Sequence, residues 1–358
     1  MILRIFLLMG MAVVVWAQEA ESGFELRSTV SVQAAHAPDL TEQPRDGAPW
    51  AGGFQALLYP TWKLDSHWAI SGAIQVHSRP YFDEEFRTQG YGIKTQILNA
   101  NVSYSRFWGK GSVVVRAGQL TSAFGSFLLR YDPASNPLTG VPAGYGYYGN
   151  GVAVEGLAGA QVDGTIGPFD MRAQFTNSSP VNPRSVFDCD QYANWTGGAG
   201  YTIRQGFRVG VSAYRGPYLD RQYEFYFPGE ARPRDLPSTG YGLDVQWGHG
   251  PWNLYGELSH FQMTYKAIPT FNMHTGYAEV RRSLTPRWYA AGRFGYVRPI
   301  GYTGTESYEA AVGFRATPHQ VLKLGYTTKH YTPADEQVEH IVMIQFVTSF
   351  KAFGFAGR

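Results

Sequence analysis

The chain has 358 residues, with 30 Lys and Arg against 28 Asp and Glu, 15% aromatic residues, 42 glycines and one cysteine, Cys189. The near balance of charge disfavours nucleic acid as a partner, because nucleic-acid-binding proteins usually carry a strongly basic face. One cysteine excludes an intrachain disulfide. Low charge with many aromatic residues and glycines suits a chain that has one face in lipid.

Residues 1–17 are predicted to be a secretory signal peptide. Arg4 gives the positive start, residues 5–16 the apolar run, and Val15-Trp16-Ala17 the cleavage site. The alternative, a membrane-spanning helix, is disfavoured because the run falls short of ~20 apolar residues. Residues 18–358 contain no linker, charge run or helix-length apolar stretch, so they are predicted to be a single domain. In lipid only helices and closed barrels satisfy the backbone, so a membrane role requires a barrel.

The mature chain reads as about sixteen alternating runs of roughly nine to eleven residues, the length of a tilted transmembrane strand. In the first run Val30 and Val32 share one face, while Ser31 and Gln33 share the other. The pattern predicts an all-β fold, a closed antiparallel up-and-down transmembrane β-barrel of about 16 strands. A soluble propeller has a similar hairpin period but would not explain the loop lengths described below.

In two further runs, individual residues are assigned to the apolar or the polar face. In the fourth, Leu98 is assigned to the apolar face together with Ala100 and Val102. In the run that starts at residue 151, Val152 and Val154 are assigned to the face opposite Glu155. The last run, residues 340–350, leaves open whether Phe350 or Phe355 ends the final strand.

Short and long connections alternate along the chain. Short turns are predicted near residues 66, 109, 166, 205, 250, 285 and 318. Longer loops are predicted at 37–50, 78–90, 121–150, 177–195, 215–238, 262–275, 298–306 and 331–339. This is typical of an outer-membrane barrel with short periplasmic turns and long outer loops. Because the first connection is long, the N-terminus is expected in the periplasm.

Residues 121–150 form the longest stretch without alternation and are rich in Gly, Pro, Ser and Tyr. Loops of this length in compact folds are uncommon and usually functional. We expect a loop that follows strand 5, folds into the barrel and narrows the channel. The constriction is assigned to Arg116 at its root and to Arg130 and Asp132 within it. Anchoring of the loop to the wall is assigned to the apolar side chains Phe124, Phe127, Leu128 and Leu129.

The face opposite the apolar one carries both signs of charge. Charged side chains there are expected to face water inside the barrel, because a base facing lipid at mid-depth costs ~2–4 kcal/mol. The predicted pore-lining set is Lys94, Glu155, Arg172, Arg208, Asp244, Glu257 and Arg293. The same inward face also holds Lys63, Asp170, Glu279, Glu309, Arg315 and Lys323. A barrel this wide leaves an aqueous channel; the alternative is a lumen closed by salt bridges. The balance of charge predicts weak selectivity.

Five large rings stand at or beside the first residue after a short turn, each on the apolar face. They are Trp68, Phe169, Phe207, Trp252 and Trp288. Rings at one level are expected to form an interfacial aromatic girdle. The alternative is that turns are simply followed by apolar residues.

No chemistry beyond transport is indicated. The G-x-G-x-x-G match at 144–149 lacks the strand before it and the helix after it that dinucleotide binding requires. No P-loop, G-x-S-x-G or H-E-x-x-H motif is present, so no enzyme activity, cofactor or metal site is expected.

Acidic clusters at Asp83-Glu84-Glu85, and at Asp335-Glu336 with Glu339 and His340, are candidates for cation bridges to lipopolysaccharide. The leading function is passive diffusion of small hydrophilic solutes; the alternatives are an adhesion or structural barrel and an outer-membrane lipid-modifying enzyme.

The layout resembles the sixteen-stranded bacterial porins, whose constriction loop follows the fifth strand. Val115-Arg116-Ala117-Gly118-Gln119-Leu120, followed by Ala123-Phe124-Gly125, is similar to the arginine-glycine-glutamine and phenylalanine-glycine pattern of the phosphate-selective porin O/P-like family. This resemblance implies a homotrimer that passes small anions. The sequence departs from the family in lacking a lysine-rich cluster and a clear arginine ladder.

Overall fold

The computed structural model describes residues 22–38, 50–82, 92–146, 151–183, 192–219, 232–265, 269–301, 304–332 and 338–356. The predicted signal peptide at 1–17, Cys189 and the acidic cluster Asp83-Glu84-Glu85 lie outside these ranges. Among the described residues, no helix has the length and apolar character needed to cross a bilayer.

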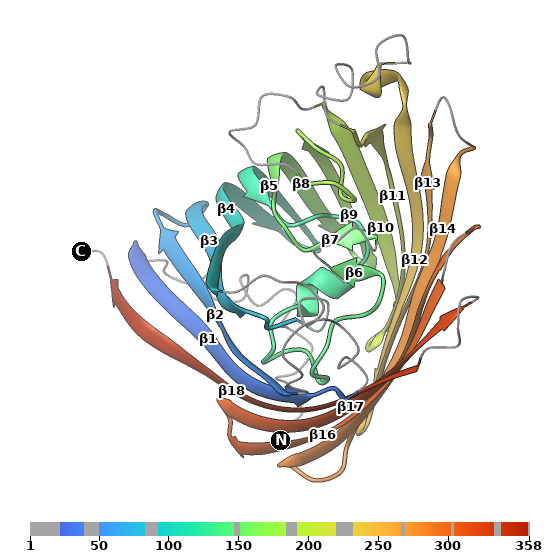
Figure 1. Ribbon diagram of the computed structural model, residues 1–358. Helices are drawn as coiled ribbons and strands as arrows, with labels where there is room; N and C mark the ends of the chain where they lie inside the picture. The colour runs from blue at the N-terminus through green and yellow to red at the C-terminus, as the bar shows by residue number, and fades with distance from the viewer. Residues whose placement is uncertain are drawn as a thin grey trace.

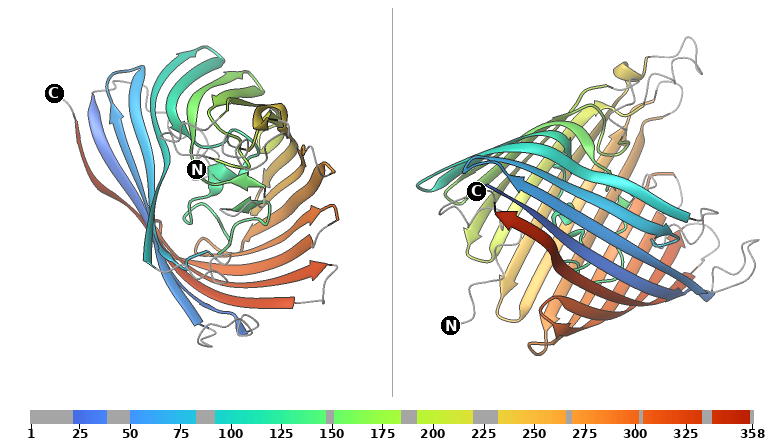
Figure 2. Two further views of the ribbon diagram at one scale, coloured as in Figure 1. Left: turned by 45° about the horizontal axis from the view of Figure 1, so that its top comes forward. Right: turned by 90° about the vertical axis from the view of Figure 1, so that its left-hand side faces the viewer.

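Sixteen strands of the described chain close into one antiparallel barrel (Figures 1 and 2). They are β1 (Gly23–His36), β2 (Trp50–Lys63), β3 (Trp68–Arg79), β4 (Gly92–Trp108), β5 (Gly111–Leu120), β8 (Leu157–Ile166), β9 (Phe169–Thr176), β10 (Asn194–Arg204), β11 (Phe207–Pro217), β12 (Pro237–His249), β13 (Trp252–Met263), β14 (Phe271–Ser283), β15 (Trp288–Pro299), β16 (Gly304–Thr317), β17 (Gln320–Thr332) and β18 (Val338–Ala356). Each barrel strand pairs with its neighbour in the chain, and β1 pairs with β18, so the sheet has no open edge. The predicted fold class is confirmed.

The connections alternate in length as the sequence predicts. Two to four residues join the strands at 64–67, 109–110, 167–168, 205–206, 250–251, 284–287 and 318–319. The other connections lie at 37–49, 80–91, 121–156, 177–193, 218–236, 264–270, 300–303 and 333–337, and all of them are longer except 300–303, which has four residues. Gly23 pairs with both Ala356 and Lys63, so the first and last strands meet at the end of the barrel that carries the short turns.

The strands alternate between an apolar outer face and a largely polar inner face. On β18, Val342, Ile344 and Phe346 point outward, whereas Met343 and Gln345 are buried inside the barrel. This period of two is what a sheet requires when one face contacts lipid and the other contacts a hydrated interior. Strand β18 continues through both Phe350 and Phe355 to Ala356, so neither phenylalanine ends it.

Two predicted faces are wrong. The register between β3 and β4 shifts at Ala73 and Ile74, which pair with Asn99 and Ile97, so Leu98 is left over as a bulge and is buried inside the barrel. Val152 and Val154 are also buried inside, because β8 begins only at Leu157. The inward-folding connection therefore runs from 121 to 156.

The five predicted girdle rings are the first residues of β3, β9, β11, β13 and β15, and all lie on the outer face. Three of them contact a second ring directly across the sheet: Trp68 with Tyr104, Phe169 with Tyr201, and Trp288 with Phe314, at centroid distances of 4.7–5.1 Å. Phe207 pairs with Trp247. The band of rings at the short-turn end is thus wider than the five residues that the sequence singles out.

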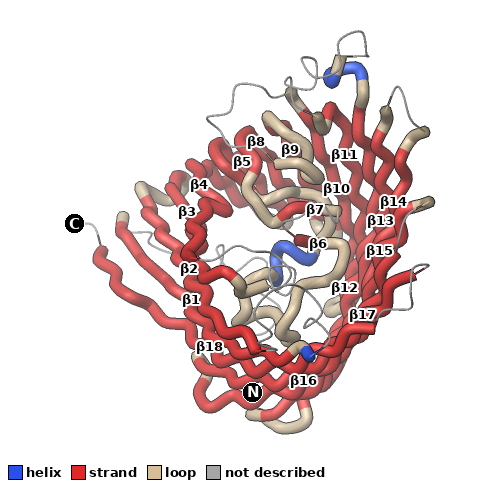
Figure 3. The backbone as a smooth tube through the Cα atoms, viewed as in Figure 1, coloured by secondary structure: helices blue, strands red, loops and turns tan. Residues whose placement is uncertain are grey.

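The described residues 121–146 and 151–156 of the connection 121–156, called here the lumenal segment, cross the interior of the barrel (Figures 1 and 3). It contains a single turn of 3-10 helix, η3 (Phe127–Arg130), and a two-stranded parallel pair, β6 (Tyr145–Gly146) and β7 (Val152–Ala153). A second short helix, η4 (Pro233–Asp235), lies in the connection before β12. Of the second acidic cluster, Asp335 and Glu336 lie outside the described ranges, while Glu339 faces the interior and His340 the outside.

Candidate functional site: the lumenal segment and the charged wall

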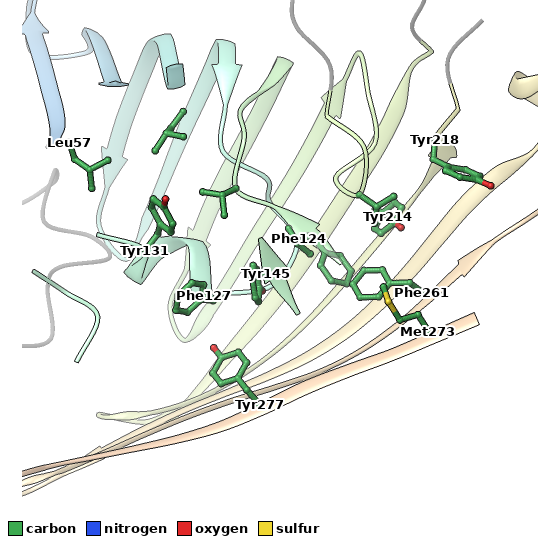
Figure 4. Packing of buried hydrophobic residues seen from close by; sticks show 14 residues of the cluster. Leu57, Phe124, Phe127, Tyr131, Tyr145, Tyr214, Tyr218, Phe261, Met273 and Tyr277 are labelled. Atoms are coloured by element: carbon green, nitrogen blue, oxygen red, sulfur yellow. The ribbon is translucent and has the colours of Figure 1, made fainter. Parts of the chain in front are cut away.

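Aromatic packing fixes the lumenal segment to one side of the barrel wall. Phe124, Phe127 and Tyr145 are almost fully buried against inward-facing rings of β11, β13 and β14 (Figure 4). The wall residues of this cluster include Tyr214, Phe261 and Tyr277. The predicted anchoring role is consistent with the burial of Phe124 and Phe127 and the partial burial of Leu128. Leu129 is 56% exposed and does not anchor the segment.

Gly125 allows the segment to approach the wall closely. Its φ is +71°, in the left-handed region that favours glycine. A Cβ at this position would collide with the hydroxyl of Tyr145 and would lie 2.7 Å from Oε2 of Glu257. The glycine is therefore required both by the backbone conformation and by the space that the anchoring groups leave.

Glu257 on β13 is the main polar anchor of the segment. Its Oε1 accepts hydrogen bonds from the backbone N–H of Ser126 (3.0 Å), the Ser126 hydroxyl (2.7 Å) and the Tyr277 hydroxyl (2.8 Å). Its Oε2 accepts from the Tyr145 hydroxyl. Burial and the charge of Glu257 raise the pKa of Tyr145 well above its usual value, so this hydroxyl remains a donor at neutral pH. Glu257, predicted to line the pore, is instead buried beneath the segment.

Arg130 and Arg293 belong to one buried ionic network. The carboxylate of Glu279 accepts hydrogen bonds from Nη1 of Arg130 at 2.6 Å and from Nη1 of Arg293 at 3.2 Å. Arg293 also donates to Glu309 through Nε and Nη2. Arg130 lies over the Tyr255 ring at 3.7 Å. Burial opposes its charge, but Glu279 outweighs that effect and raises the pKa of Arg130, so it stays cationic. Charges buried in such pairs position the segment more than they attract solutes.

Asp132 lies on the other side of the segment and joins it to β1 and β2. Its Oδ2 accepts hydrogen bonds from Thr29 (2.9 Å) and Tyr59 (2.6 Å). Its Oδ1 accepts from the backbone N–H of Ala134 at 2.8 Å. Arg130 and Asp132, predicted together as the constriction, therefore bond to different parts of the wall, Arg130 to β14 and Asp132 to β1 and β2.

Most of the remaining predicted pore-lining residues lie on the wall and form local ion pairs. Arg208 bridges Asp170 (2.7 Å) and Asp244 (2.6 Å). The other pairs are Arg116 with Asp163, and Lys94 with Glu155 at 3.5 Å. Glu155 lies in the lumenal segment just before β8 and also accepts from Gln96 at 2.6 Å. These pairs put both signs of charge on the inner surface without a large field of one sign.

Two arginines of the inner face make no ion pair with a described carboxylate. Arg172 reaches only the carbonyl oxygen of Gly125, at 3.5 Å. Arg281 on β14 lies 4.8 Å from the centre of the Tyr289 ring.

Lys323 has a larger role than the sequence indicates. It is 1% exposed, and its Nζ donates to the carbonyl oxygens of Pro133 (2.7 Å), Asn136 (2.8 Å) and Leu138 (3.1 Å) and to Oε1 of Gln345 (2.9 Å). The alternation assigns Lys323 to the inner face, but no local pattern indicates that the segment would reach β17. The sequence does hold a signal for the inward tyrosines. Tyr277 is two residues from Glu279 on the same strand and therefore shares its inward face, so the alternation of faces also predicts its position.

Solved structures with the same fold are outer-membrane channels. An anion-selective porin from Comamonas acidovorans aligns with a TM-score of 0.64 at 10% identity, over 92% of this chain and 100% of that chain. OprB of Pseudomonas putida aligns with a TM-score of 0.64 at 12% identity, over 92% and 94%. The outer-membrane channel DcaP of Acinetobacter baumannii aligns with a TM-score of 0.61 at 10% identity, over 93% and 99%. No family model and no curated protein matches the chain. At these identities the likeness establishes the fold, a sixteen-stranded porin-type barrel.

Proposed function

We propose that the protein is an outer-membrane porin, a passive diffusion channel for small hydrophilic solutes that is narrowed by the lumenal segment. One observation carries the proposal: a closed sixteen-stranded barrel has an apolar outer face and a charged inner face, with a segment bonded across its interior. Charged side chains on alternate positions of a wide barrel face water or buried polar partners and not lipid, and barrels of this strand number leave an aqueous channel.

A weak anion preference is part of this proposal. The carboxylates named above all accept hydrogen bonds or ion pairs, whereas Arg172 and Arg281 keep charge without a carboxylate partner in the described chain. Charged groups at a narrow passage set ion preference. The structural neighbour from Comamonas acidovorans is anion-selective, which agrees with this reading. Specific selection of phosphate has no support here beyond the short resemblance around Arg116.

Several features of the cellular setting complete the proposal. We infer export through the signal peptide at 1–17, a periplasmic N-terminus on the short-turn side, lipopolysaccharide at the outer rim, and a homotrimer. One of the structural neighbours is a trimeric outer-membrane protein of Vibrio cholerae. We infer no enzymatic activity. Neither an adhesion barrel nor a lipid-modifying enzyme has a supporting observation among the described residues.

Recording from purified protein in a planar lipid bilayer tests the proposal. Stepwise increases in conductance are expected as single channels insert, with a reversal potential in a KCl gradient that shows mild anion preference. Folded barrels that insert but carry no current would overturn it, and hydrolysis of added lipid by the same preparation would favour the enzyme alternative.

A further inference from the structure

A cavity of about 580 Å³ lies inside the barrel, between the lumenal segment and the inner wall. Its wall side is formed by β14–β18 with β1 and β2, close to the end that carries the long connections. Its floor is formed by residues 131–143 of the segment. Cavities that bind small molecules usually measure ~300–1,000 Å³, so this one is large enough for a ligand and not only for solvent.

The cavity is nearly free of net charge. Among the described residues that line it, the charged ones are Glu309 and Lys329, and Glu309 is already bound by two nitrogens of Arg293 at 2.9 and 2.8 Å. The other polar groups are amides and hydroxyls. Thr139, Thr305 and Thr327 are partly exposed on its surface. Recognition here must therefore rely on neutral hydrogen bonds more than on charge.

Apolar and aromatic side chains alternate with these neutral polar groups. Phe82 and Tyr131 lie almost parallel, with ring centroids 6.5 Å apart and 26° between the planes. Met273 and Met343 line the wall opposite the segment. Rings and methionines provide polarisable surface for the C–H groups of a ligand, while hydroxyls and amides bind its polar edge.

Gln55 indicates which polar groups the ligand must carry. It lines the cavity and is 2% exposed. Its Nε2 donates to Gln75 Oε1 (2.9 Å) and to the hydroxyl of Tyr131 (3.3 Å), which fixes the orientation of the amide. Its Oε1 is then a buried acceptor without a partner. A buried acceptor left unpaired is costly, so a small movement of the amide toward a donor in the cavity would be favourable. A solute with O–H groups supplies such a donor, whereas a fully deprotonated anion does not.

We propose that this cavity binds neutral polyhydroxylated solutes of the size of a mono- or disaccharide before they pass the lumenal segment. The inference rests on the proposed channel function and adds the substrate class that the outer half of the lumen selects. It assigns Gln55 as a hydrogen-bond acceptor for a solute hydroxyl, with the Phe82 and Tyr131 rings as the apolar contact.

Isothermal titration calorimetry on the purified full chain in detergent, with sucrose as the probe, tests the inference directly. Saturable binding is expected. A polyethylene glycol of matched size, which carries ether acceptors and almost no donors, and inorganic sulfate, which carries no O–H group at neutral pH, are both expected not to bind at this site. Sucrose should also reduce single-channel conductance with a saturable dependence on concentration, whereas the glycol should reduce it linearly.

Gln55→Met tests the assigned acceptor while keeping the side-chain length. Sucrose affinity is expected to fall about tenfold, the effect of losing one good hydrogen bond. The matched control is Gln246→Met, which alters an inward glutamine of β12 away from the cavity and should leave affinity unchanged. Retained resistance of the barrel to cold dodecyl sulfate shows that each variant is folded.

The two proposals fail separately. Open channels without saturable sucrose binding, glycol binding equal to sucrose binding, or unchanged affinity in a folded Gln55→Met protein would each overturn the polyol site. Sucrose binding by a barrel that carries no current would overturn the channel and leave the binding site standing.

Discussion

The Nζ atom of Lys323 on β17 lies 2.8 Å from the backbone carbonyl oxygen of Asn136 in the lumenal segment. The same ammonium also donates to the carbonyl oxygens of Pro133 and Leu138, and no carboxylate bonds to it directly among the described residues. A single side chain thus holds six residues of the segment against a wall far from the strand where the segment begins. Lys323 fixes the segment to β17, as Glu257 fixes it to β13.

Lys323→Met is expected to release the lumenal segment from β17. The substitution keeps an unbranched chain but leaves three buried carbonyls without their donor, at a local cost of about 1–3 kcal/mol each at most. The segment should fluctuate, so single-channel recordings should show a larger mean conductance and more open-channel noise. Lys63→Met is the control, since Lys63 faces the same lumen but makes no hydrogen bond to the segment in the described chain. Equal noise in the two variants would contradict the holding role.

The architecture could be predicted because lipid and water impose a strict period of two on every strand. Alternation located nearly all strands and turns, and it assigned Lys323 and Glu279 to the correct face. It failed at Leu98, Val152 and Val154, where the interior is packed with the lumenal segment instead of water. There an apolar side chain points inward, so hydrophobicity no longer reports the face.

The candidate site was less predictable for a related reason. Which wall groups meet the segment depends on its path, and no local pattern encodes that path. Arg130 and Asp132 were correctly placed within the segment, but their partners Glu279 and Tyr59 lie on strands far away in the chain. The charge of an inward side chain predicts contact with water, whereas Glu257, Arg130 and Arg293 are buried anchors of the segment.

Arg208→Gln is expected to shift ion selectivity toward cations. Removing this guanidinium leaves Asp170 and Asp244 facing each other on the lumen wall, which adds uncompensated negative charge. The partly exposed site can relax with water, so the stability cost should be only about 1–3 kcal/mol. The reversal potential in a tenfold KCl gradient measures the shift. Asp244→Asn, which removes a carboxylate from the same cluster, should move it in the opposite direction, and a common direction for both would refute the electrostatic reading.

Glu257→Leu is expected to detach the lumenal segment from β13. The change leaves the Ser126 N–H and the hydroxyls of Tyr145 and Tyr277 without their shared acceptor, each at a cost of about 1–3 kcal/mol if it stays buried. The segment should become sensitive to protease added to the folded protein, with cleavage between residues 121 and 146, while the barrel itself remains intact. Asp163→Leu is the matched control, because Asp163 is a partly exposed carboxylate of β8 whose bonds to Arg116 and Gln161 lie within the wall. Cleavage of both variants at the same rate would count against Glu257 as the anchor.

The turn between β2 and β3 is expected to weaken in acid. Oδ1 of Asp65 accepts the backbone N–H groups of His67 (2.7 Å) and Trp68 (2.8 Å), and these two bonds hold the pKa of Asp65 below its usual value. A lowered pKa in the folded protein means that the ionised form contributes stability above about pH 4, and that the contribution is lost as the pH falls through the folded value. Hydrogen exchange of the Trp68 amide, corrected for the intrinsic rate, should therefore lose protection below pH 4. In Asp65→Asn the side-chain oxygen still accepts but does not titrate, so protection should be lower at neutral pH and nearly independent of pH. Equal acid loss in the wild type and in Asp65→Asn would show that another group controls the turn.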